Sequence, residues 1–480
     1  MFESLPSPAS LAGADDAAVV AAIEAGSRAE SGAAATRLAA IAELMERRLG
    51  DDEDERGLWA CDGWDSAAAE IAAALGISHR RASSQMHLAY ALRTRLPRTA
   101  ARLAEGAISL AIAATIAWRT RLVVDSDAMA TIDSELAIQA TRWGPLSEKG
   151  LDNAIDAVLE EHDPSARYEY NAAIRYRDVQ FGKPDDATGT SSLYGSLKSP
   201  DAVLFDRRLR AMIRGVCSDD PRTIGERRSD AVGALLAGSD RLACRCGKPE
   251  CVGAGTDSRA DSVVIHVVAD ERAVQSAHTA KPEATPTKDP YYAAVLQGGG
   301  VVPPAQLAEL IDAGAKISPL RAPDQTAEPR YRPSAKLARF IRARDLTCRF
   351  PGCSASAEIC DVDHTIPDER GGPTHPSNLA CLCRKHHLLK TFWSEWSETQ
   401  HPDGSITWTT PTGKTYTTYP GSKAVFPHWD TTTAPLPAPD ATRPAAPIAN
   451  RGLQMPRRKR TRRAEQAQRI KSERARHDSG

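Results

Sequence analysis

Pairs of cysteine and histidine residues with the spacing of metal ligands occur in one short stretch of the last third of the chain. Two cysteines flank a Pro-Gly turn, and a further cysteine is followed three positions later by a histidine. Zinc takes four such ligands in a tetrahedron, and metal affinity then serves as folding energy for a module with little core. The predicted ligands of a structural zinc are Cys348, Cys353, Cys383 and His386. Cys360 or Cys381 could replace one of these four ligands.

A second set of polar residues is interleaved with the first and has too few soft ligands for a structural zinc. Phosphodiester hydrolysis needs an activated water and a cation that stabilises the leaving oxygen. The carboxylate of Asp363 and the imidazole of His387 suit a divalent ion such as magnesium or manganese. His364 could deprotonate the water, because the ordinary pKa of histidine is about 6.5. Asn378 could hold the loop and orient His364, so this set indicates nucleic-acid cleavage.

These residues resemble the motif of the HNH endonucleases, the ββα-metal (His-Me finger) class. In that motif an Asp-His pair ends the first strand, an Asn-Leu pair precedes a helix, and the helix carries a histidine and a lysine. Many relatives use four cysteines for the structural zinc, whereas His386 stands at the fourth position here. The resemblance implies His364 as general base, Asn378 as the middle residue of the motif, and Asp363 with His387 as ligands of the catalytic ion.

The sequence upstream of this motif resembles the helical domain of unknown function that precedes HNH motifs in actinobacterial proteins. Segments that carry the resemblance are Leu75-Gly76-Ile77-Ser78, Gly225-Glu226-Arg227-Arg228-Ser229-Asp230-Ala231 and Tyr331-Arg332-Pro333-Ser334. It extends over roughly residues 30–330. This part of the resemblance implies an architecture but no chemistry.

Composition and periodicity predict an α+β multidomain protein with a mostly helical N-terminal domain. Residues 1–165 are rich in Ala, Leu, Arg and Glu at helical spacing, which is typical of a helical bundle. Ser66 and Ser78 are candidate N-caps in this region, and Gly76 lies where one helix must stop. Residues 166–330 mix helices with strands, two of which are expected at 168–176 and 262–268. Residues 331–425 should form the HNH module and a β-meander, because Pro-Asp-Gly and Pro-Thr-Gly turns separate its strands. Residues 426–480 should be a disordered linker and a basic tail.

Basic residues in three places are candidates for DNA contact. Residues 70–90 can be interpreted as a helix-turn-helix, although an ordinary helical hairpin with a basic face is the alternative. The helix of the HNH module carries two more cations. The arginine-rich tail would add salt-sensitive phosphate binding, although such a run is often a solvated tail. The individual candidates are Arg80 and Arg81 in the hairpin and Arg384 and Lys390 in the module.

A second cysteine cluster leaves two alternatives open. Cys244, Cys246 and Cys251 could bind zinc together with a fourth ligand, Cys217 or His266. Alternatively, the same cysteines form a reduced loop that binds no metal.

The whole chain sets further limits on the class of protein. Its net charge of −1 gives no general attraction to polyanions or membranes, and most of its 10 cysteines are clustered, which favours metal over disulfides in a reducing cytosol. The N-terminus lacks the pattern of a signal peptide, and the longest apolar stretch is too short for a membrane span. We therefore expect a cytoplasmic DNA endonuclease with no membrane partner, with a homodimer as one expectation. The alternative is a non-catalytic DNA-binding protein with a zinc-stabilised HNH-like module.

Overall fold

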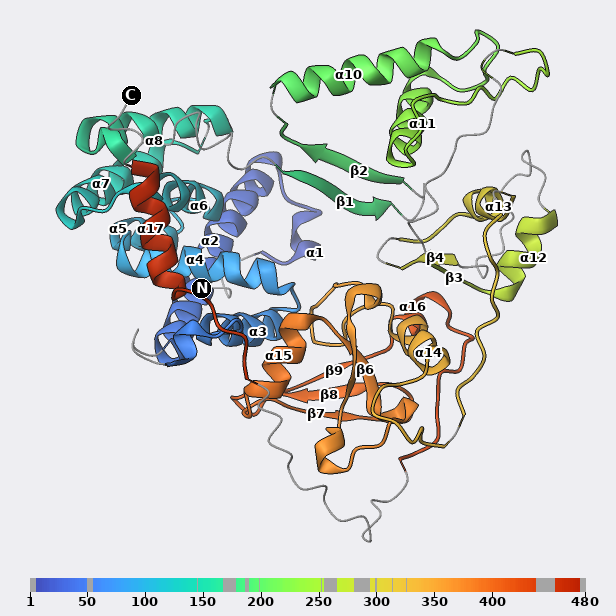
Figure 1. Ribbon diagram of the computed structural model, residues 1–480. Helices are drawn as coiled ribbons and strands as arrows, with labels where there is room; N and C mark the ends of the chain where they lie inside the picture. The colour runs from blue at the N-terminus through green and yellow to red at the C-terminus, as the bar shows by residue number, and fades with distance from the viewer. Residues whose placement is uncertain are drawn as a thin grey trace. The chain divides into compact units, whose positions relative to one another are not determined.

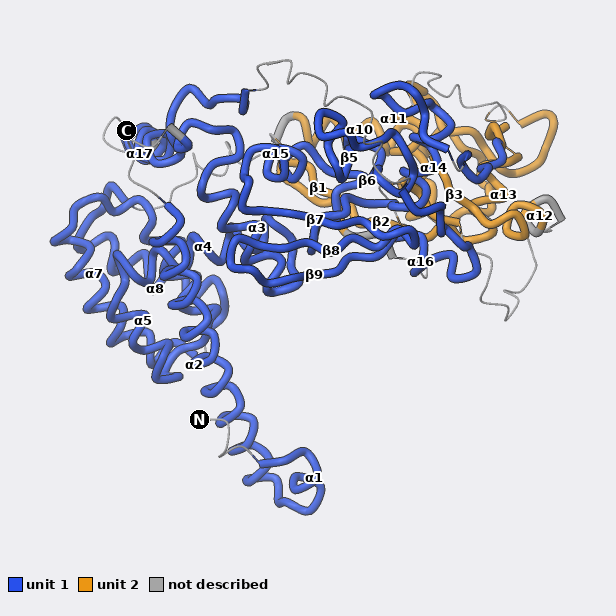
Figure 2. The backbone as a smooth tube through the Cα atoms, turned by 90° about the horizontal axis from the view of Figure 1, so that it is seen from below, with its two compact units in different colours: residues 1–169, 318–480 blue, residues 170–317 orange. Residues whose placement is uncertain are grey.

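The computed structural model divides the chain into two compact units (Figures 1 and 2). Unit 1 comprises residues 1–169 and 318–480, and unit 2 comprises residues 170–317. The predicted α+β class is confirmed, and none of the described helices is both long and apolar enough to cross a membrane. The described residues are 6–49, 55–144, 146–166, 178–185, 190–197, 199–251, 253, 266–279, 294–297, 300–312, 314–324, 326–436 and 454–474.

The N-terminal part of unit 1 is a helical bundle with one apolar core. Small and aliphatic side chains fill this core, and Ala67, Ala68 and Ile116 are completely buried. Side-chain caps start these helices, as where Asp62 accepts a hydrogen bond from the N–H of Asp65, except α5, which begins with a proline. The helices are α1 (Pro8–Leu11), α2 (Asp16–Arg48), α3 (Gly63–Leu75), α4 (His79–Thr94), α5 (Pro97–Ala104), α6 (Leu110–Arg119), α7 (Ser126–Gln139) and α8 (Glu148–His162).

The C-terminal part of unit 1 begins with α14 (Ala335–Asp345) and contains the ββα element expected of an HNH module. Strand β5 (Asp361–His364) pairs antiparallel with β6 (Leu379–Leu382), and α15 (Arg384–Phe392) follows directly. A three-stranded antiparallel meander comes next, so the predicted β-meander is confirmed. Its buried Trp408 packs edge-on against Phe350 of the module, with ring centroids 5.0 Å apart. The meander strands are β7 (Ser397–Gln400), β8 (Ile406–Thr409) and β9 (Thr415–Thr418), with α16 (Ser422–Val425) after them.

A buried group of three charged side chains connects α14, the ββα element and the meander. Asp345 is ion-paired with Arg344 and Arg349, and all three side chains are buried. The two guanidinium groups also donate to the carbonyls of Leu379 and Thr418, while Asp345 accepts the N–H of Cys381. Burial opposes ionisation of Asp345, but the charges of the two arginines outweigh it and lower the pKa of this carboxyl. The carboxylate is therefore needed to balance two buried cations.

Removal of this carboxylate is expected to destabilise unit 1 strongly. Asp345→Ala leaves two buried guanidinium groups without a counter-charge, which typically costs about 3–5 kcal/mol. Denaturant unfolding of the full chain measures the effect. Asp324→Ala is the matched control, because Asp324 is exposed and forms only a surface pair with Lys336. Equal stabilities of the two variants would show that the buried group does not act as described.

The bundle and the HNH module pack directly against each other within unit 1. The indole Nε1 of Trp393 donates to the carbonyl of Cys61, 3.0 Å away, and Lys385 pairs with Asp65 at 2.8 Å. Gly352 has φ +72°, and a Cβ there would lie only 2.2 Å from the carbonyl oxygen of Ile77. The turn of the module therefore approaches the α3–α4 connection as closely as only glycine allows.

The basic tail contains a helix that the sequence did not predict. It forms α17 (Arg462–Arg474), which lies against the bundle in Figure 1. Arg462 pairs with Asp62 and Asp65, each at 3.0 Å, and Arg474 pairs with Asp163 at 2.8 Å. Carboxylates about 400 residues away in sequence neutralise the start of this helix, and no local pattern in the tail could predict them. The linker at 437–453 lies outside the described residues.

In its described residues, unit 2 forms two small two-stranded antiparallel sheets and four helices. The predicted strand at 168–176 lies outside the described residues, as does most of that predicted at 262–268. Strand β1 pairs antiparallel with β2, and β3 with β4. A small apolar core lies between α10 and α11. The elements are β1 (Val179–Asp185), β2 (Thr190–Gly195), α10 (Ser199–Arg214), α11 (Ile224–Leu236), β3 (Val267–Ala269), α12 (Glu271–Thr279), β4 (Ala294–Leu296) and α13 (Pro304–Asp312).

Candidate metal centres and active site

The four residues predicted as zinc ligands come together in the structure. Their candidate ligand atoms all lie within 4.8 Å of one another. The Nδ1 atom of His386 is 3.3 Å from Cys383 Sγ and 3.5 Å from Cys348 Sγ, and the imidazole stacks on Phe350 at 4.0 Å. Cys360 and Cys381, the alternatives, are not members of this group. We name the set Cys348, Cys353, Cys383 and His386 the cysteine–histidine group; its geometry could hold a metal ion.

Asp363 and His387 face each other across the gap between β5 and α15. The Nε2 atom of His387 lies 3.2 Å from Asp363 Oδ1. Burial opposes ionisation of Asp363, but the hydrogen bond from His387 and the charge of Lys390 hold the pKa of this carboxyl below its usual value. Burial would lower the pKa of His387, but the carboxylates of Asp363 and Asp361 outweigh it and raise this pKa. The carboxylate oxygen and the imidazole nitrogen are a donor pair that suits a hard or borderline divalent ion.

Asp361 is a site residue that sequence reasoning missed. Its Oδ2 atom lies 2.8 Å from Nδ1 of His387, the nitrogen opposite the one that faces Asp363. A carboxylate in this position fixes the tautomer and the orientation of a metal-binding histidine. The signal was present in the sequence, because residues two apart on a strand share one face, and Asp361 precedes Asp363 by two.

The imidazole of His364 is buried between Tyr331 and Thr374. It stacks on the Tyr331 ring at 5.2 Å, and its Nε2 atom is 2.9 Å from the hydroxyl of Thr374. When the Thr374 hydroxyl donates its one proton to the carbonyl of Tyr331, 3.2 Å away, it accepts a hydrogen bond from Nε2–H of His364. This arrangement leaves Nδ1 as the basic nitrogen. Burial lowers the pKa of His364, against the charge of Asp363, so the neutral form that can take up a proton is favoured.

Asn378 holds the loop between the two strands of the ββα element. Its Oδ1 atom accepts the N–H of Ile366 at 2.8 Å, and its amide nitrogen donates to the carbonyls of Ile366 and Pro373. The side chain is almost completely buried. Its position sets the path of the loop that carries Thr374, and through Thr374 it affects the orientation of His364.

The predicted DNA contacts differ in exposure. Lys390 is 9% exposed and pairs with Asp363 at 2.7 Å and with Glu398 at 2.9 Å. This position corrects the interpretation of Lys390 as a DNA contact, because its ammonium group is already paired with the carboxylates of Asp363 and Glu398. Arg384 is exposed, as are Arg80 and Arg81 near the start of α4.

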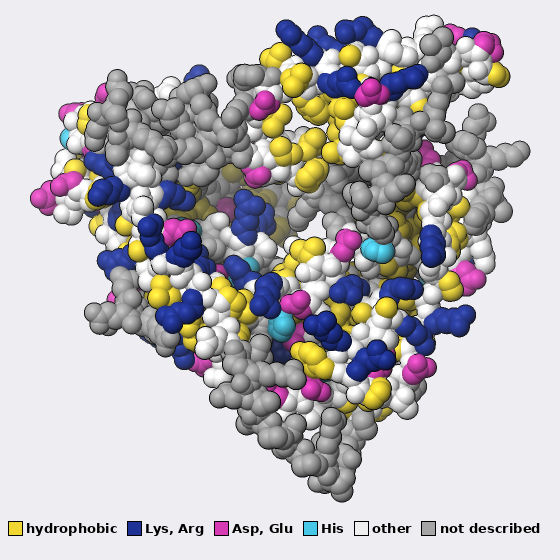
Figure 3. Space-filling model, in the orientation of Figure 1, with side chains coloured by type: hydrophobic (Ala, Val, Ile, Leu, Met, Phe, Trp, Pro, Cys, Tyr) yellow, Lys and Arg dark blue, Asp and Glu magenta, His cyan; other side chains and the backbone are white. Residues whose placement is uncertain are grey.

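Packing around α4 and the charged side chains around α15 affect which surfaces of unit 1 a nucleic acid could contact. The first residue of α4, His79, lies against the module, with its ring 5.6 Å from that of His386. The start of the predicted recognition helix is therefore partly covered by the module. In Figure 3, Lys and Arg side chains gather around acidic and histidine side chains over the part of unit 1 that carries α15.

Comparison with known proteins gives first the class of the C-terminal module. Residues 347–392, which contain both ligand sets, match the family described as HNH endonuclease. Residues 25–345 match the family described as domain of unknown function (DUF222). The chain therefore belongs to the DUF222 family, with an HNH endonuclease domain directly after the domain of that family. This confirms the arrangement inferred from the sequence.

Proteins from Mycobacterium tuberculosis are similar in sequence to this chain over nearly its whole length. Uncharacterized protein Rv2100 of strain H37Rv is 52% identical over 507 residues, which cover 100% of this chain and 91% of the relative. Uncharacterized protein Rv3776 of the same strain is 54% identical over 489 residues, covering 99% and 93%. No solved structure matches the chain significantly.

Proposed function

We propose that the protein is a metal-dependent DNA endonuclease that hydrolyses phosphodiester bonds with its HNH module. One observation carries this proposal: Asp363 Oδ1 and His387 Nε2 lie 3.2 Å apart. The next residue after Asp363 is His364, whose imidazole is buried. The match of this stretch to the HNH endonuclease family supports the same reaction. A DNA partner, a cytoplasmic location and a homodimer stay predictions of the sequence.

The charge balance of the site supports binding of a divalent cation, magnesium or manganese. The carboxylates of Asp363 and Glu398 pair with Lys390, and a third carboxylate, that of Asp361, pairs with His387 and Arg384. His387 presents Nε2 toward Asp363 because Asp361 engages Nδ1. A cation held by Asp363 and His387 would supply the positive charge that stabilises the phosphate and the leaving oxygen.

The remaining roles fall to residues of the chain itself. In this proposal Nδ1 of His364 takes the proton from the attacking water, because Nε2–H is committed to Thr374. Asn378 acts as a positioning residue through the loop that carries Thr374. The cysteine–histidine group would bind a structural zinc, since two sulfurs lie within 3.5 Å of the imidazole nitrogen of His386. Arg384, Arg80 and Arg81 are proposed to contact the DNA backbone.

Cleavage of supercoiled plasmid by the full chain tests the proposal. Nicked or linear DNA should form with magnesium or manganese and not with excess chelator of these ions. His387→Ala should lose cleavage, because it removes one of the two proposed ligands of the catalytic ion. The same substitution removes the hydrogen-bond partner of Asp361. His401→Ala is the matched control, since His401 is exposed on the meander, where its imidazole contacts the hydroxyl of Thr407.

Two results would count against this function. Equal cleavage by the wild type and His387→Ala would exclude the assigned centre. Tight binding of duplex DNA by both proteins, with no cleavage in either metal, would instead favour the non-catalytic DNA-binding alternative.

A further inference from the structure

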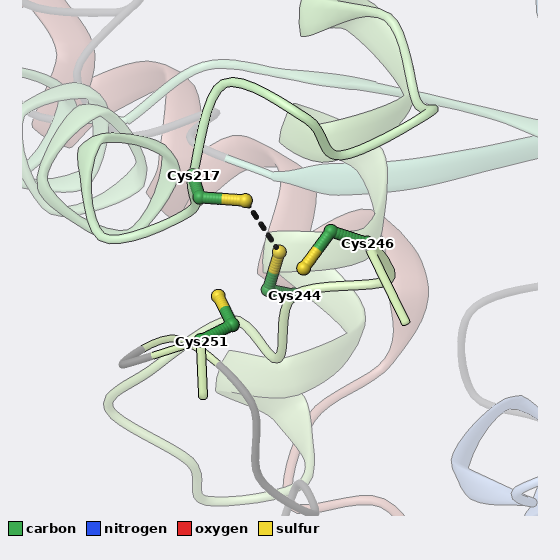
Figure 4. Close-up of side chains that lie close together, drawn as sticks. All are labelled: Cys217, Cys244, Cys246 and Cys251. Atoms are coloured by element: carbon green, nitrogen blue, oxygen red, sulfur yellow. Dashed lines mark hydrogen bonds between the residues drawn. The ribbon is translucent and has the colours of Figure 1, made fainter. Parts of the chain in front are cut away.

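Unit 2 contains a second group of metal-type ligands that the proposed nuclease site does not use. The sulfurs of its four cysteines all lie within 4.8 Å of one another, and Figure 4 shows their side chains pointing toward a common centre. Cys217 follows α10, whereas the other three lie in the segment after α11. The fourth member is thus Cys217 and not His266. We name Cys217, Cys244, Cys246 and Cys251 the four-cysteine group.

The distances fit a metal tetrad better than a disulfide. The Sγ atoms of Cys217 and Cys244 are 3.4 Å apart. Sulfurs in a disulfide are about 2.05 Å apart. Four thiolates at about 2.3 Å from a zinc ion would be separated by about 3.8 Å along the edges of the tetrahedron. All four sulfurs converge, whereas disulfides would need two separate pairs.

The two segments that carry the cysteines are held together by contacts independent of any metal. Asp220, buried and ion-paired with Arg222 at 2.8 Å, accepts the N–H of Arg245. Arg222 also donates to the carbonyl of Ala243, 2.7 Å away. These bonds place the chain on either side of Cys244 next to the turn that follows Cys217. The four-cysteine group is therefore preorganised by the fold.

We propose that the four-cysteine group binds a structural zinc ion that joins the segment after α11 to the end of α10. An all-thiolate tetrahedral set selects zinc or iron, and four protein ligands leave no open position for a substrate. The apolar core between α10 and α11 is small, so a metal would supply folding energy that apolar burial does not. This zinc is separate from the one proposed for the cysteine–histidine group and does not depend on nuclease activity.

Zinc content of the full chain, purified without added chelator, tests this inference. The wild type should contain about two zinc ions per chain, one for each group. Cys244→Ser and Cys383→Ser should each lower the content by one, and the double variant should contain none. Cys61→Ser is the matched control and should keep both ions, because Cys61 is buried in unit 1 outside both groups.

A second measurement on the wild type covers the case in which Cys244→Ser does not fold. A strong zinc chelator should accelerate tryptic cleavage after Arg245, which lies between Cys244 and Cys246. A zinc content that Cys244→Ser leaves unchanged, iron in place of zinc at this group, a disulfide among these four cysteines, or tryptic cleavage unchanged by chelation would each overturn the proposal.

Discussion

His364→Ala is expected to lower the rate constant of DNA cleavage by about 10²- to 10⁴-fold, the usual contribution of a positioned general base. Thr374 engages Nε2 of this imidazole, which leaves Nδ1 as the nitrogen that can take up a proton. Alanine removes this base but leaves Asp363 and His387 in place, so binding of manganese should be retained. Single-turnover cleavage of plasmid under saturating manganese measures the loss.

Variants of Thr374 separate loss of a base from general damage to the site. Thr374→Ser keeps the hydroxyl that fixes the tautomer of His364, whereas Thr374→Val removes it and leaves a buried N–H without an acceptor. We expect Ser to retain most of the rate and Val to lose roughly tenfold to a hundredfold. A rate for His364→Ala within a factor of two or so of the wild type would rule out His364 as the base.

Cys383→Ser is expected to remove zinc from the cysteine–histidine group and with it the fold of the HNH module. Zinc binding in small modules contributes about 10–16 kcal/mol of apparent free energy, which far exceeds the stability of a typical domain. The sulfur of Cys383 also lies next to the start of α15, so its loss should release the helix that carries His387. Hydrogen exchange should show loss of protection over residues 348–391, together with loss of cleavage.

The matched control for this variant is Cys360→Ser. Cys360 is buried beside the cysteine–histidine group but is not one of its members. Zinc and cleavage should therefore survive its substitution. Loss of zinc from Cys360→Ser but not from Cys383→Ser would mean that the ligand set is assigned wrongly.

Local signals in the sequence predicted the helices of the bundle well. Ser78 caps α4 as expected, and Gly76 ends α3 in the left-handed conformation, with φ 62°. Ser66 was expected to cap the preceding helix, but this helix starts earlier, with Asp62 as its cap. Both serine and aspartate make good caps, so the sequence alone does not say which of two neighbouring candidates is used.

Long-range contacts were beyond sequence reasoning. The ion pairs of Arg462 with Asp62 and Asp65 join residues about 400 positions apart, and no local sequence pattern predicts them. The same holds for the burial of Lys390, which depends on Glu398 in the meander. In contrast, the motif around His364 was predictable because fixed spacings on a strand and a helix bring its residues together. The tautomer of His364 required the structure, since it follows from the contact between Thr374 and Tyr331.

Manganese binding measured by electron paramagnetic resonance tests most directly whether Asp363 and His387 hold the catalytic ion. The zinc-loaded full chain should bind about one manganese ion per chain. The double variant Asp363→Ala, His387→Ala should lose this ion and DNA cleavage together, while zinc content and folding stay unchanged. Undiminished manganese binding in the double variant, or cleavage that continues without the ion, would contradict the account.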